Sequence, residues 1–296
     1  MVDVAVASGD QLGEGAYYDH EAGCLWWVDI PMPSALNRLD LATNTHQRFA
    51  MPQMISAVRA WRGRDELLVA CHSGLGMVGR DGNNFTHLMD PEPERPFNRS
   101  NDSGTDPQGR FWFGTMQNNM APDGTALDIR SASGALYRVE HDLSVTKQQD
   151  NIAVPNSISW SPDGRIFYAC DTMERTIFAH DYDAETGTIT ARRPFARFNR
   201  GVPDGSCVDA DGCLWNARWG GGCVVRFTPA GEVDRVFEIP VSRVTSCAFG
   251  GPQFGTLFIT TAWHGATAAE RAAQPLAGHL FALRPGVKGL PAPPFG

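Results

Sequence analysis

Short hydrophobic runs rich in aromatic and β-branched residues recur along the whole chain, each introduced by a polar turn. This pattern of turn and short apolar run is typical of β-strands. The six runs are GCLWWVDI, DELLVACH, GRFWFGTM, GRIFYACD, GCLWNARW and GTLFITTAW. Alignment of the second strand residue in each run gives Trp26, Leu67, Trp112, Phe167, Trp215 and Phe258. The three tryptophans in this set are predicted to lie in the core.

The repeats follow one another at intervals of 41 to 55 residues. A period of about 40–50 residues with several strands per unit is the signature of a β-propeller. A further strand pattern follows most of the repeats, at 134–140, 176–183, 223–231 and 279–286. The sequence therefore predicts an all-β fold, a six-bladed β-propeller. No linker or low-complexity segment divides the chain, so a single domain is expected over residues 1–296.

Two segments depart from the strand pattern. Residues 267–274 read as a short helix, because Thr267 and Glu270 form a T-x-x-E capping box and Pro275 ends the segment. The proline-rich tail GLPAPPFG is expected to be a frayed end.

Composition narrows the class of protein. Hydrophobic residues make up 42% and charged residues 20%, and the net charge is −8. An acidic chain without a Lys/Arg cluster does not favour nucleic acid or an anionic membrane as a partner. The N-terminus lacks the features of a signal peptide, and no apolar run approaches the ~20 residues that span a bilayer. The seven cysteines form no CxxC pair and are expected to be reduced thiols packed in strands. A cytoplasmic protein without an obligate protein partner is predicted.

Polar residues stand at nearly equal distances before four of the repeated strands. Glu14 precedes Trp26 by 12 residues, and an offset of 11 residues separates Asn101 from Trp112, Asn156 from Phe167, and Asp204 from Trp215. In a propeller, residues before these strands lie at the mouth of the central channel. Blade symmetry would therefore bring all four towards one axis.

The stretch GVPDGSCVDADG supports this interpretation. Asp211-Gly212 fits an ordinary hairpin turn, whereas Asp204-Gly205, only seven residues earlier and behind Pro203, leaves no room for a second hairpin. Asp204 is therefore predicted at the axis, with Cys207 in the following strand and facing the core.

Glu, Asn and Asp together offer only oxygen ligands, which suit a hard divalent ion such as calcium, magnesium or manganese. The alternative is that these residues cap turns, as Asn and Asp often do, but four at one offset favour a site. None of the eight histidines shows metal-ligand spacing, and His20, His180 and His279 are expected at the surface or in turns.

Several motifs resemble the SMP-30/gluconolactonase family over nearly the whole chain. They are LGEG at 12–15, RSNDSGTDPQGRFWFGTM at 99–116, PNSISWSPDGRIFY at 155–168, DTMERTIFAHDYD at 171–183, GVPDGSCVDADGCLWNARWGGG at 201–222 and SCAFGG at 246–251. The resemblance implies a six-bladed propeller. It also implies one divalent cation held by Glu14, Asn156 and Asp204, and a substrate contacted by Arg99 and Asn101. Family members often have glycine after the metal-binding Asn, where this chain has Ser157.

By this resemblance the chain is expected to hydrolyse a sugar-acid (aldono) lactone to the free acid, with Asp204 as the catalytic base and Asp102 as the next candidate. The identity of the metal is left open, and the candidates are calcium, zinc, manganese, magnesium and iron(II). One alternative is a hydrolase of aryl esters or organophosphates on the same fold. Such substrates need an apolar pocket, and this alternative stays open because apolar residues stand near the proposed channel mouth, namely Phe97, Phe113, Met116 and Trp219. Another is a calcium-binding propeller without catalysis.

Overall fold

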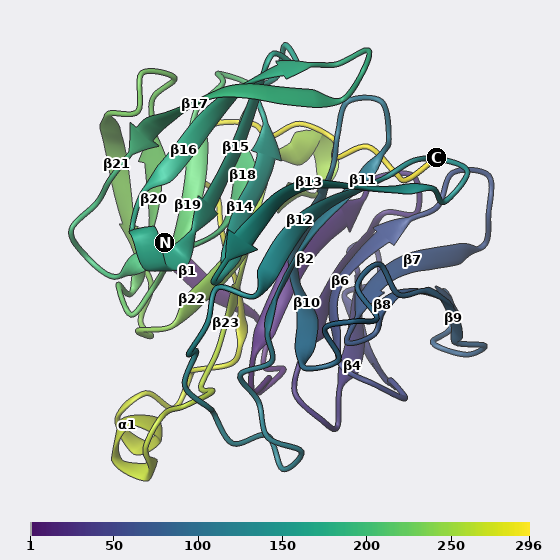
Figure 1. Cartoon of the computed structure of the whole chain (residues 1–296). Helices are drawn as coiled ribbons and strands as arrows, with labels where there is room; N and C mark the ends of the chain where they lie inside the picture. Colours follow the sequence, from purple (N-terminus) through teal and green to yellow (C-terminus); the bar gives the residue numbers. More distant parts are fainter. Residues whose placement is uncertain (1) are drawn as a thin grey trace.

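Six four-stranded antiparallel sheets are arranged around a common axis in the computed structural model, which describes residues 2–296 (Figure 1). The predicted six-bladed β-propeller is confirmed. Blades 1 to 3 are β2 (Gly13–Asp19), β3 (Cys24–Asp29), β4 (Ala35–Asp40) and β5 (Thr45–Ala50); β6 (Ile55–Ala60), β7 (Glu66–Cys71), β8 (Gly74–Gly79) and β9 (Thr86–Met89); and β10 (Asn98–Thr105), β11 (Phe111–Gln117), β12 (Gly134–Val139) and β13 (Val145–Ile152).

The second half of the chain forms blades 4 to 6 in the same way, and the last blade joins the two ends of the chain. These blades are β14 (Pro155–Trp160), β15 (Ile166–Asp171), β16 (Ile177–Asp183) and β17 (Thr188–Ala196); β18 (Val202–Val208), β19 (Leu214–Trp219), β20 (Cys223–Phe227) and β21 (Val233–Glu238); and β22 (Val244–Gly250), β23 (Thr256–Thr261), β24 (Leu280–Leu283) and β1 (Val2–Val6). Because β1 pairs with β24, the ring is closed by backbone hydrogen bonds between its two ends.

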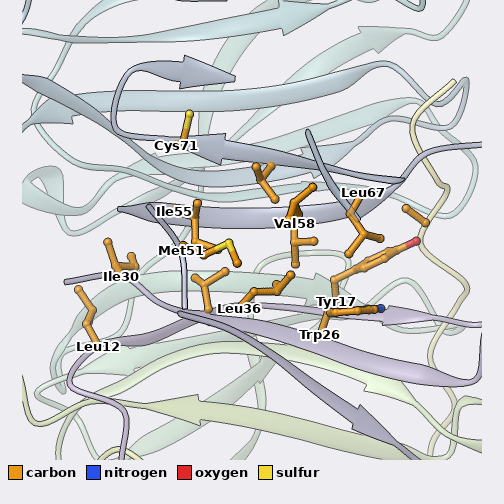
Figure 2. Close-up of a cluster of buried hydrophobic side chains, with 14 of the residues drawn as sticks. Leu12, Tyr17, Trp26, Ile30, Leu36, Met51, Ile55, Val58, Leu67 and Cys71 are labelled. Carbon is orange, nitrogen blue, oxygen red and sulfur yellow. The ribbon is translucent and has the colours of Figure 1, made fainter. Parts of the chain in front are cut away.

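The first strand of each blade is the innermost one, since it contacts the first strand of the next blade around the ring. The repeated hydrophobic runs form the second strands β3, β7, β11, β15, β19 and β23. Their side chains fill the space between neighbouring blades. Figure 2 shows one such cluster, in which Trp26 packs with Tyr17, Leu36, Val58 and Leu67 between blades 1 and 2.

Trp112 and Trp215 lie in the core as predicted, and each is held by a buried aspartate in the turn before its strand. The indole nitrogen of Trp112 donates to Asp106 Oδ2 over 3.1 Å, and that of Trp215 donates to Asp209 Oδ2 over 2.8 Å. Both aspartates are fully buried, and Arg226 pairs with Asp209 at 2.7 Å. Asp209 therefore has a structural role, although it lies only five residues after Asp204.

The predicted helix is α1 (Ala268–Ala273), where Thr267 and Glu270 form the expected capping box. Two 3₁₀ turns, Thr172–Glu174 and Pro252–Phe254, complete the helical structure of residues 2–296. No helix in this part of the chain is long and apolar enough to cross a membrane.

Two expectations from the sequence, one about a residue and one about a segment, are wrong. His180 is not a surface residue: it lies in β16 with 3% of its surface exposed and packs beside Phe167. The proline-rich tail is not frayed either. Phe295 is fully buried against Trp61, its N–H donates to Ala60 O over 2.8 Å, and its carbonyl accepts from Arg62 N over 2.7 Å.

Burial of Phe295 predicts that the tail stabilises the propeller. Phe295→Ala should lower the free energy of unfolding by about 3–5 kcal/mol, because it removes a fully buried aromatic side chain. Urea unfolding measures this change. Leu290→Ala is the control, because Leu290 lies in the same tail with 39% of its surface exposed. Equal small effects of both substitutions would mean that the tail is frayed after all.

Candidate functional site

The innermost strands of four blades break their pairing register where the candidate residues stand. The interruptions fall between Glu14 and Tyr17 in β2, Ser100 and Ser103 in β10, Asn156 and Ser159 in β14, and Pro203 and Ser206 in β18. Such bulges re-aim side chains and are common beside functional sites. The equal offsets seen in the sequence thus correspond to one repeated backbone feature.

Two bulges place the residue after a candidate ligand in the left-handed region. Gly15 has φ 62° and Ser157 has φ 63°. Glycine adopts this conformation without strain, whereas serine does so at a cost. Ser157 is fully buried, and its hydroxyl donates to Asp204 O over 2.7 Å. The departure from the family's glycine is therefore accommodated, and the serine side chain ties β14 to the backbone of Asp204.

Glu14 and Asp204 are brought together from blades 1 and 5. Their carboxyl groups are close enough to affect each other's pKa, and the amide of Gly15 donates to Glu14 Oε2 over 3.0 Å. Burial, and next the charge of Asp102, raise the pKa of Glu14 to about 8. Burial also raises the pKa of Asp204 well above its usual range, with the charge of Glu14 as the next cause. A carboxyl pair of this kind holds a proton unless a cation takes its place.

Asn156 is held with a defined amide orientation. Thr172 Oγ1 donates to the carbonyl of Pro203 over 2.8 Å, so it accepts from Asn156 Nδ2, which lies 2.8 Å away. Asn156 Oδ1 is left as an acceptor, and Asn101 Nδ2 donates to it over 3.1 Å. The amide oxygen of Asn156, which is 4% exposed, is thus available as a ligand.

Arg99 is buried and fixed by hydrogen bonds. It donates to Ser100 O over 2.7 Å, to Asn101 Oδ1 over 2.9 Å, and to Asn119 Oδ1 from both Nε and Nη2, over 3.2 and 2.8 Å. Burial lowers the pKa of Arg99 to about 10, while the charges of Glu14 and Asp204 act in the opposite direction. Arg99 therefore stays protonated at neutral pH, and its charge acts on Glu14 and Asp204 without a direct hydrogen bond to either.

Asp102 has both carboxylate oxygens engaged by the backbone. Oδ1 accepts from Ser103 N over 2.8 Å, and Oδ2 accepts from Ile158 N over 3.0 Å, which connects β10 to β14. Burial raises the pKa of Asp102 to about 6, although these bonds oppose the shift. This arrangement favours a structural role for Asp102 and makes it a weaker candidate for a base.

Sequence reasoning missed Asn119 and Thr172, which position Arg99 and Asn156. Both follow a repeated strand, whereas the equal offsets directed attention only to residues before these strands. The polar residues that closely follow β11 and β15 could have directed attention to Asn119 and Thr172.

Phe113 and Met116 belong to the core of blade 3, since both are fully buried, and Phe97 is 81% exposed.

The donor set fits a hard divalent cation. Within residues 2–296 no group of three or more His, Cys, Asp or Glu side chains is arranged to hold a metal. Two carboxylates and an amide oxygen are present instead, and oxygen ligands are those that calcium, magnesium and manganese prefer. The charges of Arg99 and Arg218 lower the pKa values of Glu14 and Asp204 respectively, but they do not offset the effect of burial, which a bound cation would counter.

Comparison with known proteins gives one consistent result. The family model described as SMP-30/Gluconolactonase/LRE-like region matches residues 12–263. A putative sugar lactone lactonase, YvrE, of Bacillus subtilis is 32% identical over 96% of this chain and 94% of its own. Regucalcin of Danio rerio is 32% identical over 98% of this chain and 96% of its own. The crystal structure of a calcium-binding protein, regucalcin, from Agrobacterium tumefaciens has a TM-score of 0.90 and 33% identity, and the match covers 99% of this chain and 96% of that one.

The raised pKa of Glu14 predicts a pH-dependent effect of metal on stability. An unfolded chain ionises this residue near its ordinary pKa of about 4.5, whereas the folded, metal-free protein holds the proton up to a pKa of about 8. Stability without metal should therefore fall as pH rises through this window. A divalent cation should raise Tm more at pH 8 than at pH 5.5, because it no longer competes with the proton.

Thermal unfolding with calcium, manganese or chelator at the two pH values measures this difference. Glu14→Gln removes the titrating group and serves as the control, so its metal-induced change in Tm should be smaller and depend less on pH. Equal gains in Tm at both pH values for the unmodified protein would contradict the assignment.

Proposed function

Because the chain belongs to the SMP-30/gluconolactonase family, we propose that it is a lactonase that uses one divalent cation to open the cyclic ester of an aldonic acid. The observation that carries the proposal is the carboxyl pair of the partly buried Glu14 and the buried Asp204, beside the fixed guanidinium of Arg99. Glu14, Asn156 and Asp204 would hold the cation. When bound, such a cation polarises a carbonyl and lowers the pKa of water.

The residues around this position would divide the work of binding and proton transfer. Four of the five N–H donors of Arg99 are already used by Ser100, Asn101 and Asn119, so Arg99 offers one Nη2 N–H and its charge. This charge would stabilise negative charge that develops on the lactone oxygen. Asn101 Oδ1 retains a lone pair that can accept a hydrogen bond from a substrate hydroxyl.

Asp204 would act on the attacking water. A carboxylate oxygen of Asp204 accepts a proton from water as the water oxygen adds to the lactone carbonyl carbon, and the proton then passes to the ring oxygen as the acyl–oxygen bond breaks. The product is the open-chain acid.

Gly205, the residue after Asp204, gives β18 room to approach β22, since a Cβ there would lie 2.6 Å from Ser246 Oγ.

A panel of substrates tests the proposal. Aldonolactones of five- and six-membered ring size, an aryl ester and an organophosphate are assayed by acid release, with chelator and with metal added back. Fastest turnover of a lactone, lost with chelator and restored by metal, supports the proposal. Faster turnover of the aryl ester or the organophosphate, or metal binding without any turnover, overturns it in favour of the corresponding alternative.

Arg99→Ala should lower kcat/KM for the best lactone by about 10²-fold or more, because it removes a positive charge beside the reacting oxygen. Metal affinity should not weaken, since arginine cannot ligate a cation. Kinetics and calorimetric titration of metal measure the two effects separately. Arg64→Ala is the matched control, because Arg64 is exposed and stacks on Trp61. An equal loss in metal affinity and turnover would disprove this role.

Asp204→Asn should cost roughly 10²–10⁴-fold in kcat at saturating metal, a loss typical of a missing general base. Asparagine keeps an oxygen ligand but accepts no proton. Asp211→Asn is the control in the same segment, since Asp211 lies in the hairpin turn with its side chain 65% exposed and paired to Arg226. Near-normal kcat in Asp204→Asn would leave Asp204 as a ligand only.

A further inference from the structure

A cavity lies on the axis, at the end opposite to the candidate site. Its volume is about 330 Å³, and every innermost strand contributes to its wall. The wall residues come from the later half of each strand, such as Arg59 in β6 and Cys207 in β18, whereas Glu14 and Asp204 stand earlier in theirs. The C-terminal segment 290–293 contributes to this wall, whereas Glu14, Asn156 and Asp204 do not, so the cavity differs from the proposed lactone site.

Arg59 is a buried cation that lines this cavity without an ionic partner. It is 8% exposed, and it donates to Val58 O over 2.7 Å and to Ser103 O over 2.9 Å. Its Nε has no hydrogen-bond partner within the described residues 2–296. The nearest acid that affects its charge is Asp102, whose oxygens already accept backbone N–H groups. A buried charge without a partner costs several kcal/mol, so the site favours an anion.

The remaining wall is largely aromatic and apolar. Tyr17 lies beneath the guanidinium, with 5.0 Å between Arg59 Cζ and the ring centroid. Trp160, Phe249 and Pro293 also line the cavity, and the indole N–H of Trp160 has no partner among the described residues. A volume of about 330 Å³ falls at the small end of the range for small-molecule sites, which are mostly apolar with a few fixed polar groups.

We propose that this cavity binds a small aromatic monocarboxylate, with the carboxylate at Arg59 and the ring between the aromatic and proline side chains. One negative charge matches the single cation. A phosphate would bring more negative charge and leave the apolar wall without contacts. Ordered water could hydrate the guanidinium of Arg59 but would gain nothing from the apolar wall, which is why an organic anion fits better.

Titration with benzoate tests the proposal. Calorimetry is done with chelator present and repeated in Arg99→Ala, so that binding at the lactone site is excluded. Benzoate should bind both proteins equally, and Arg59→Met should weaken binding at least tenfold, whereas Arg64→Met, an exposed arginine on the neighbouring segment, should not. No binding by the unmodified protein would mean that water alone fills the cavity, and unchanged affinity in Arg59→Met would mean that benzoate binds elsewhere. Either result overturns the proposal.

Cys207 provides a second measurement that needs no change at Arg59. It lines the cavity with its Sγ 3.6 Å from Cys247 Sγ, and it is the one free cysteine among the seven that is not buried. Benzoate should slow modification of Cys207 by a thiol reagent, and the neutral analogue benzyl alcohol should not. Cys207→Ala identifies the modified thiol. Absence of protection by benzoate, or equal protection by the alcohol, contradicts a carboxylate site at Arg59.

Discussion

The carboxyl groups of the partly buried Glu14 and the buried Asp204 lie together on the axis of this propeller, and their proximity connects the fold to its chemistry. Burial of both as anions would cost several kcal/mol each, and their mutual repulsion adds to that cost. The folded protein therefore gains from a proton or a cation at this position. The surrounding groups leave this need unmet, because Arg99 is held by Asn101 and Asn119 rather than by the acids.

The backbone makes this unfavourable contact possible. Bulges in four innermost strands direct polar side chains towards the axis, and the left-handed residues Gly15 and Ser157 follow two of these side chains directly. The second and third strands of each blade are largely buried and hold the innermost strands in place, whereas the outermost strands are mostly exposed. The free energy gained by packing between blades thus offsets the cost of the left-handed backbone and of the ionisable side chains at the axis.

The axis carries different ionisable groups at its two ends. Glu14 and Asp204 lie at one end, Arg59 lines the cavity at the other, and Asp102 lies between them with its carboxylate bound by two backbone N–H groups. The C-terminal segment covers the Arg59 end, and Phe295 anchors it against Trp61. Each end therefore has a different chemistry, although the same six strands form both.

Much of this arrangement could be predicted from the sequence, because propeller symmetry turns an equal offset along the chain into an equal position around the axis. The offsets before Trp26 and Trp215 identified Glu14 and Asp204 in this way. Asn119 and Thr172 could not be found by offset, since they follow the repeated strands. The tail was misjudged because its prolines suggest disorder, whereas the buried slot for Phe295 is made by Trp61, which is distant in sequence.

The central claim is that a divalent cation completes the acid pair at the axis. A crystal structure of the protein grown with manganese, with anomalous diffraction recorded, tests it most directly. We expect one anomalous peak within coordination distance of the carboxylates of Glu14 and Asp204 and of Asn156 Oδ1, with water completing the shell. A well-ordered site without an anomalous peak between these three side chains would contradict the account.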